Sequence, residues 1–248
     1  SGLSYLCNYG SESDNSDSGE AEINKPKLPA PDLSRVPVVL FETHADDPEL
    51  HGGRTRTFPH VRGNWATFVY VKYTAEEGLL KLIEKLEVKL LINGNLWQRC
   101  DNIHISVSKT VVLNYHLITP FTTSLQKTVG ELESFELGFS GVKVYCNEDN
   151  SRTFIALQAD FFSQKYLLEL TKKVDEVLLD FKLPTFYEVP SFHMSIFWIN
   201  GNYKSEANSI LEDLNKIVNF EIDKSLKTCL VDKINCKSGN KYFQYNTN

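Results

Sequence analysis

The sequence predicts an α+β protein made of two pseudo-symmetric β-α lobes, each with an antiparallel-rich sheet, which flank a central cleft. Three observations lead to this expectation. Runs rich in β-branched and aromatic residues alternate with stretches of helical periodicity, the same order of elements occurs twice, and a histidine triplet stands at the equivalent strand of each half. With 248 residues, 42% of them hydrophobic, the chain can bury the core that such lobes need.

The first fifty residues differ in composition from the rest. They hold five of the nine prolines, and their ten acidic residues stand against only Lys25, Lys27 and Arg35, a balance of −7. Such a segment has too few apolar side chains to offset the entropy lost on ordering. We therefore expect a disordered acidic tail over 1–50 and a folded domain over 51–248. The domain carries 22 acidic and 23 basic residues, so the net charge of −6 does not exclude a nucleic-acid partner.

The first lobe is expected over roughly 65–147. Residues 65–72 are rich in aromatic and β-branched side chains, which is typical of a strand, and leucines at helical spacing follow over 75–92. The pattern then predicts a strand, a helix that starts near Pro120, and another strand. These three elements are expected over 102–108, 119–133 and 142–146.

The second lobe repeats this order over roughly 152–248. The pattern predicts a strand at 152–159, a long amphipathic helix that ends before Pro184, and an apolar strand at 192–199. A helix over 205–220 and strands over 227–234 and 241–245 complete it. Trp65 and His104 are 39 positions apart and Arg152 and His193 are 41 apart, so the two lobes agree in register.

Each lobe carries the same triplet on its second strand, His104-Ile105-Ser106 in the first and His193-Met194-Ser195 in the second. Because side chains alternate along a strand, each histidine shares a face with its serine while the apolar residue between them faces the core. One triplet alone is weak evidence. Two copies at matching places indicate a site between the lobes.

Two facing imidazoles suit a reaction that takes one proton and gives another, because histidine titrates near neutral pH. The two serine hydroxyls can bind phosphate oxygens and stabilise charge in the transition state. The triplets therefore predict phosphodiester cleavage by an internal 2′-hydroxyl. A Ser-His hydrolase fits less well, since neither motif has an orienting carboxylate. A metal site also fits less well, because two histidines and five cysteines without a CxxC pair leave too few ligands.

At these residues the sequence resembles the 2H phosphoesterase superfamily, whose members carry two His-x-Ser/Thr motifs. More narrowly, three segments resemble the U6 snRNA phosphodiesterase family: His51 to Thr67, Thr185 to Ser195, and Cys236 to Lys241. The resemblance implies a metal-independent 3′ to 5′ RNA exonuclease of the nucleus, with no cofactor, that trims the oligouridine end of U6 spliceosomal RNA. It also implies a 2′,3′-cyclic phosphate or 3′-phosphate product, and catalytic roles for His104, Ser106, His193 and Ser195. It favours His193 as the base.

Four further residues are candidates for RNA binding. In the resembling family an aromatic residue at the place of Tyr187 stacks on a nucleobase. Arg54 lies in a Gly- and Pro-containing stretch, and Lys237 and Lys241 bracket the turn 238–240; all three can approach phosphates. Each also has a structural alternative: packing for Tyr187, a solvated surface position for the basic residues.

Two other interpretations stay open. One is another 2H activity, that of a 2′,5′-phosphodiesterase or an RNA-end ligase. The other is a non-catalytic module that binds RNA ends. For the phosphodiesterase we expect a monomer whose partner is the 3′ end of single-stranded RNA.

No stretch approaches the roughly 18–20 consecutive apolar residues of a membrane span, so we expect no membrane partner.

Overall fold

The computed structural model describes residues 58–248 except 60, 75, 93, 95, 226 and 227. The expected tail and Arg54 lie outside the described residues. The strands are β1 (Asn64–Lys72), β2 (Gln98–Arg99), β3 (His104–Ser106), β4 (Val111–Asn114), β5 (Phe135–Leu137), β6 (Phe139–Cys146), β7 (Arg152–Ala159), β8 (His193–Asn200), β9 (Cys229–Val231), β10 (Lys233–Ser238) and β11 (Lys241–Asn246). The helices are α1 (Glu77–Ile92), η3 (Tyr115–Leu117), α2 (Ile118–Val129), α3 (Phe161–Asp180), α4 (Lys204–Ser209) and α5 (Leu211–Ser225).

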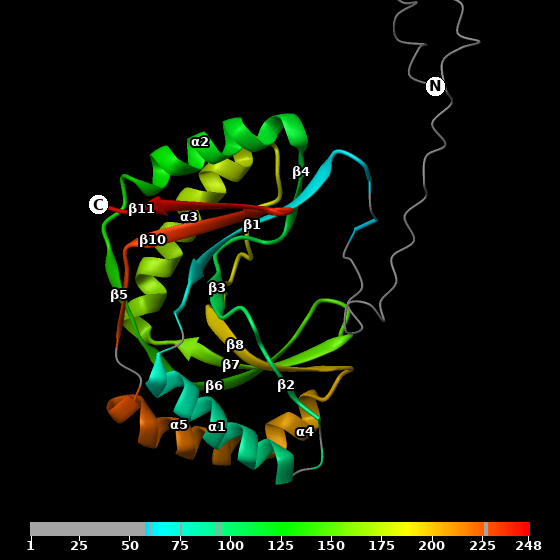
Figure 1. Ribbon diagram of the computed structural model, residues 1–248, viewed down its shortest axis with the longest axis vertical. Helices are drawn as coiled ribbons and strands as arrows, with labels where there is room; N and C mark the ends of the chain where they lie inside the picture. Colours follow the sequence, from blue (N-terminus) through cyan, green and yellow to red (C-terminus); the bar gives the residue numbers. More distant parts are fainter. Residues whose placement is uncertain (1–57, 60, 75, 93, 95, 226–227) are drawn as a thin grey trace, which may run out of the picture. The chain divides into compact units, whose positions relative to one another are not determined.

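One nine-stranded sheet forms the centre of the domain (Figure 1), with a main path in the order β11-β10-β1-β3-β8-β7-β6. The strand β2 pairs with β8, and β4 pairs with β1. The neighbouring strands of this sheet pair antiparallel throughout. The expected combination of helices with antiparallel sheet is therefore confirmed.

The two halves of the sequence exchange their closing strands. The strand β6, which closes the first half, pairs with β7, and β10, from the second half, pairs with β1. The helices follow the same rule, because α1 packs on α5 and α2 packs on α3. Each half of the sheet, with its helices, is thus built from both halves of the sequence.

Two of the sequence-based boundaries are wrong. The strand expected over 227–234 is two strands in different sheets, since β9 pairs with β5 in a separate two-stranded sheet while β10 joins the main one. The helix expected over 205–220 is broken at Ile210, between α4 and α5. The hydrophobic pattern continues without interruption across both breaks, so the sequence alone did not reveal them.

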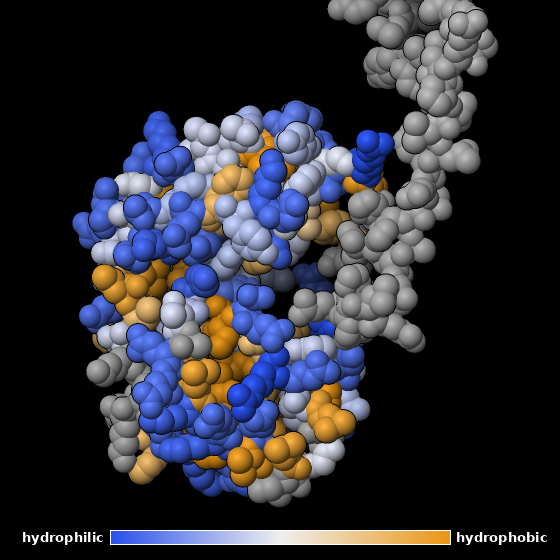
Figure 2. All heavy atoms as spheres, viewed as in Figure 1, coloured by the Kyte–Doolittle hydropathy of each residue, from blue (hydrophilic) through white to orange (hydrophobic). Residues whose placement is uncertain are grey.

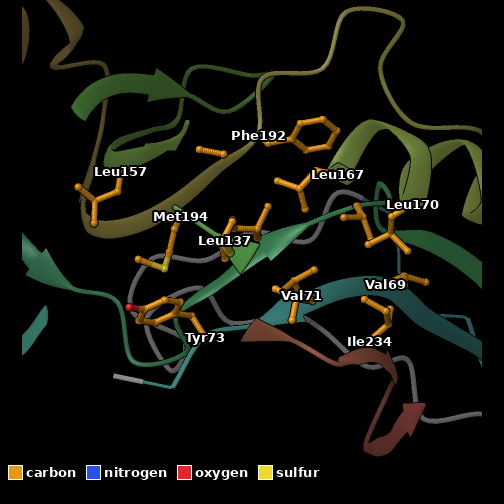
Figure 3. Packing of buried hydrophobic residues seen from close by; sticks show 14 of the residues in the cluster. Val69, Val71, Tyr73, Leu137, Leu157, Leu167, Leu170, Phe192, Met194 and Ile234 are labelled. Carbon is orange, nitrogen blue, oxygen red and sulfur yellow. The ribbon is translucent and has the colours of Figure 1, made fainter. Parts of the chain in front are cut away.

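The core lies on the face of the sheet that the helices cover. Along β1, Val69 and Val71 are buried while Phe68 and Tyr70 on the other face are half-buried, the two-residue period of a strand. Figure 3 shows Val69 and Val71 in one cluster with side chains of α3 and β8, among them Met194. The opposite face of the sheet is left for other contacts. None of the helices in the described part of the chain is long and apolar enough to span a membrane.

The side chains of Ile105 and Met194, both fully buried, support the centre of the sheet from the core side. Replacing Met194 by Ala leaves a cavity there and is expected to cost about 2–5 kcal/mol of unfolding free energy. Met194→Leu, which keeps the volume, should cost less than about 1.5 kcal/mol. Urea unfolding followed by tryptophan fluorescence measures both, and an alanine variant as stable as the parent would contradict this packing.

Candidate active site

The two triplets lie side by side at the centre of the sheet. The strands β3 and β8 are antiparallel neighbours with Ile105 opposite Met194. This register sets His104 opposite Ser195 and Ser106 opposite His193, all on the face away from the core. Directly opposite residues in such a pair have Cβ atoms roughly 4.5–5.5 Å apart and diagonal ones roughly 7–8 Å apart, so the two histidines face one small area.

Both histidines are held by the same local contact. The Nδ1 atom of His104 donates a hydrogen bond to the carbonyl oxygen of Asn102 at 2.8 Å, and Nδ1 of His193 donates to that of Ser191 at 2.6 Å. A carbonyl can only accept, so in each ring Nδ1 carries the proton. The Nε2 atoms therefore remain to take or give a proton. Backbone carbonyls here do the orienting work that a carboxylate does in a Ser-His-Asp triad.

The imidazole of His193 is also stacked on Tyr145 of β6, with ring centroids 3.7 Å apart and planes 14° apart. The Tyr145 hydroxyl is hydrogen-bonded to Oγ of Ser191 at 2.9 Å. Because the carbonyl of the same Ser191 binds the histidine, these three residues close a ring of contacts. The arrangement fixes the plane of the His193 side chain.

The imidazole of His104 contacts two aromatic rings of β1. The ring of Tyr70 meets it edge-on at 5.3 Å between centroids, and that of Phe68 lies at 5.8 Å. Burial lowers the pKa of His104, and burial, together with the nearby charges of His104 and Lys143, lowers the pKa of His193. Both rings are therefore mainly neutral at neutral pH.

The predicted binding residues fall in different places. Tyr187 is exposed in the segment before β8; its hydroxyl donates to Glu148 at 3.1 Å and its ring lies 4.3 Å from Nζ of Lys109. Lys237 lies opposite Phe68 on the face of the histidines, whereas alternation along β11 sets Lys241 on the other face, over the rings of Trp65 and Tyr115. The structure thus brings Lys237, and not Lys241, to the sheet face of the triplets.

Two lysines that the sequence did not single out flank the triplets. Lys72 lies opposite His104, and Lys143 lies opposite Ala156, which in turn is opposite Ser195. One row across five strands therefore has an exposed lysine at each end. The sequence predicts that Lys143 and Tyr145 share one face of the strand at 142–146. Only the pairing of β6 with β7 shows that this face is the one that carries the triplets.

In the part of the chain that the structure describes, no group of three or more His, Cys, Asp or Glu is arranged to hold a metal ion. A groove is lined by residues of α1 and α5, among them Val88, Ile217 and Phe220. Figure 2 shows hydrophobic side chains gathered on this part of the surface. Its lysine Lys85 is paired with Glu221 at 2.6 Å, and the groove contains no residue of the triplets.

Comparison with known proteins shows the family of the chain. The HVSL family model, described as an uncharacterised conserved protein, matches residues 26–246. U6 snRNA phosphodiesterase 1 of Bos taurus is 38% identical over 229 residues, covering 91% of this chain and 86% of the relative, and that of Homo sapiens is 38% identical with the same coverage. The chain belongs to the U6 snRNA phosphodiesterase 1 family.

The fold is similar to that of a solved structure. Usb1 of Kluyveromyces marxianus is 15% identical and superposes with a TM-score of 0.56, and the match covers 74% of this chain and 98% of that one. A structure of the same protein with uridine monophosphate gives a TM-score of 0.55. At this identity the likeness shows the fold alone.

The shared surroundings of the two histidines predict a titration behaviour. Both should titrate below the ordinary value of about 6.5, with Nδ1–H as the neutral tautomer. In a His104→Ala variant the pKa of His193 should rise, since one nearby positive charge that lowers it is gone. Ring-nitrogen NMR over pH 4–9 measures both effects. Titration of either ring above 6.5 in the parent protein would contradict the burial described here.

Proposed function

We propose that this chain is an RNA phosphodiesterase that shortens the 3′ end of U6 spliceosomal RNA. The observation that carries the proposal is the register of the two triplets, which places each histidine opposite the serine of the other triplet. The chain in which this occurs belongs to the U6 snRNA phosphodiesterase 1 family. The relatives are named U6 snRNA phosphodiesterase 1, which supports U6 RNA as the substrate. The uridine monophosphate in the Kluyveromyces marxianus structure supports a uridine end.

The reaction requires only groups that the site contains. One of His104 and His193 takes the proton of the 2′-hydroxyl of the penultimate ribose through Nε2. The 2′-oxygen then bonds to phosphorus while the bond from phosphorus to the 5′-oxygen breaks. The other histidine enters this step as the doubly protonated imidazolium, and its Nε2–H protonates the 5′-oxygen. The products are a strand with a 2′,3′-cyclic phosphate and a nucleoside with a free 5′-hydroxyl. The family resemblance favours His193 as base.

The serines have the complementary role. Ser106 and Ser195 lie diagonally across the same area, so their hydroxyls can bind the two non-bridging oxygens of one phosphate. Lys72 and Lys143 at the ends of the row add positive charge for a dianionic transition state. Neither serine is required to transfer a proton, which makes their contribution smaller than that of the histidines.

We further propose that the two halves of the sheet are pseudo-symmetric lobes related by a two-fold axis through Ile105 and Met194. The equivalent pairings support this: β1 with β3 and β10 corresponds to β7 with β8 and β6. The matching Nδ1 contacts of both histidines support it as well. The cleft between the lobes then holds the phosphate, in a nuclear, monomeric enzyme that needs no metal or cofactor.

Replacing either histidine tests the mechanism. His104→Ala and His193→Ala should each lower the rate on oligouridine by roughly 10² to 10⁴-fold, because each removes a proton-transfer group. Ser106→Ala and Ser195→Ala should cost less, and His116→Ala, which changes an exposed histidine of η3, should cost nothing. Mass spectrometry of the products, in buffer with EDTA, measures all five. A fully active His104→Ala enzyme would refute the two-histidine mechanism, and a strand bound but never shortened by the parent protein would indicate a binding module.

A single 2′-deoxy substitution tests the nucleophile. At the penultimate ribose it should leave RNA binding nearly unchanged, since bases and phosphates stay in place, and abolish cleavage. The all-ribose strand should show the mass of a cyclic phosphate at early times, one water below a linear phosphate. Cleavage of the deoxy strand at a comparable rate would mean that water or a side chain attacks instead.

A further inference from the structure

We propose that the face of β1, β10 and β11 beside the triplets binds the RNA strand upstream of the scissile phosphate. This inference rests on the proposed function and adds a second binding surface to it. We call this surface the upstream track and define it by Phe68, Lys237 and Tyr242.

The three residues form one row across three strands. Tyr242 of β11 lies opposite Lys237 of β10, and Lys237 lies opposite Phe68 of β1. Phe68 is two residues from Tyr70, which is opposite Ser106, so the row shares its face with the triplets. The upstream track is therefore continuous with the candidate active site.

The track presents aromatic surface where a sheet face usually has polar side chains. Tyr242 is 67% exposed, and Nζ of Lys237 lies 5.1 Å from the centroid of its ring. Phe68 is half-buried and stacks on Tyr70 with centroids 5.0 Å apart. The core lies on the opposite face, where Val69 and Cys236 are buried, so these rings are not needed to fill it. Aromatic faces beside a lysine are the composition that binds single-stranded nucleic acid.

Many lysines of the helices are paired with carboxylates, namely Lys81, Lys85, Lys89, Lys173 and Lys216. The lysines around the candidate active site, Lys109, Lys143 and Lys237, lie over tyrosine rings and have no ion pair with any acidic residue that the structure describes. Their charge is available to a polyanion, which commits the upstream track to RNA and not to a protein or an apolar ligand.

The distance from Tyr242 to the triplets assigns the upstream track to the part of the RNA that is kept after the cut. The strand β11 lies three strands from β3, about 14 Å at roughly 4.8 Å per strand, so Tyr242 is out of reach of a phosphate held by the histidines. An enzyme that releases one nucleoside at a time has only that nucleoside on the leaving side. The only part of the substrate long enough to reach Tyr242 is the strand upstream of the cut.

The experiment compares kcat/KM on the dinucleotide UpU and on a hexamer of uridine. In the parent protein the hexamer should be favoured about tenfold or more, since stacking of one base commonly contributes that much. Tyr242→Ala should reduce this ratio about fivefold or more, and Tyr242→Phe should keep it. Lys237→Ala should reduce the ratio and lower the slope of log KM against log salt by about one.

Two matched controls on α3, Tyr166→Ala and Lys172→Ala, should leave the ratio at its parental value. Because the readout is a ratio on two substrates, a general loss of activity cancels. If the parent protein cuts RNA but Tyr242→Ala and Lys237→Ala keep the parental ratio, the upstream track is refuted and the proposed function stands. If the parent protein cuts neither substrate, both the function and the track are refuted.

Discussion

The whole site depends on one backbone pairing, that of Ile105 with Met194. The strand β3 has only three residues, yet it joins the half of the sheet around β1 to the half around β8, and on either side of it the chain leaves to pair β2 with β8 and β4 with β1. A shift of β3 by one residue in this register would turn His104 and Ser106 into the core and away from His193 and Ser195. The two fully buried side chains hold the register from below, so core packing and the geometry of the polar face are set by the same contact.

Much of this was readable from the sequence. Alternation around His104 and His193 gave the shared face of histidine and serine, and the buried residues between them lie where the pattern put them. The exchange of β6 and β10 could not be predicted, because the hydropathy of a strand does not indicate which distant strand it pairs with. Tyr145 shows the consequence. Its contact with His193 joins residues 48 positions apart, and only the partner of β6 decides which histidine it meets.

The two faces of the sheet solve different problems. The helix side resembles any small α+β domain, with an apolar core and exposed ion pairs, which commonly contribute little to stability. The open side combines aromatic rings, lysines over three of those rings, and two half-buried imidazoles of lowered pKa. On such a surface the lysine ammonium groups and the aromatic faces can still bind the phosphates and bases of a polyanion. An acidic chain can present a basic site because its excess of acidic residues lies in the first fifty positions, while Lys109, Lys143 and Lys237 lie around the triplets.

The pairing of β1 with β10 has a consequence for how the protein is made. The hydroxyls of Thr67 and Ser238 meet at 2.8 Å although 171 positions separate them, whereas β6 and β7 are joined by a short hairpin. Contacts between such distant residues form late, because a long loop must close first. During synthesis the side of His193 can assemble early, while β1 keeps an open edge until residues 233–238 emerge. A ribosome that stops before them releases a chain with one finished half and one sheet edge ready to pair with its neighbours.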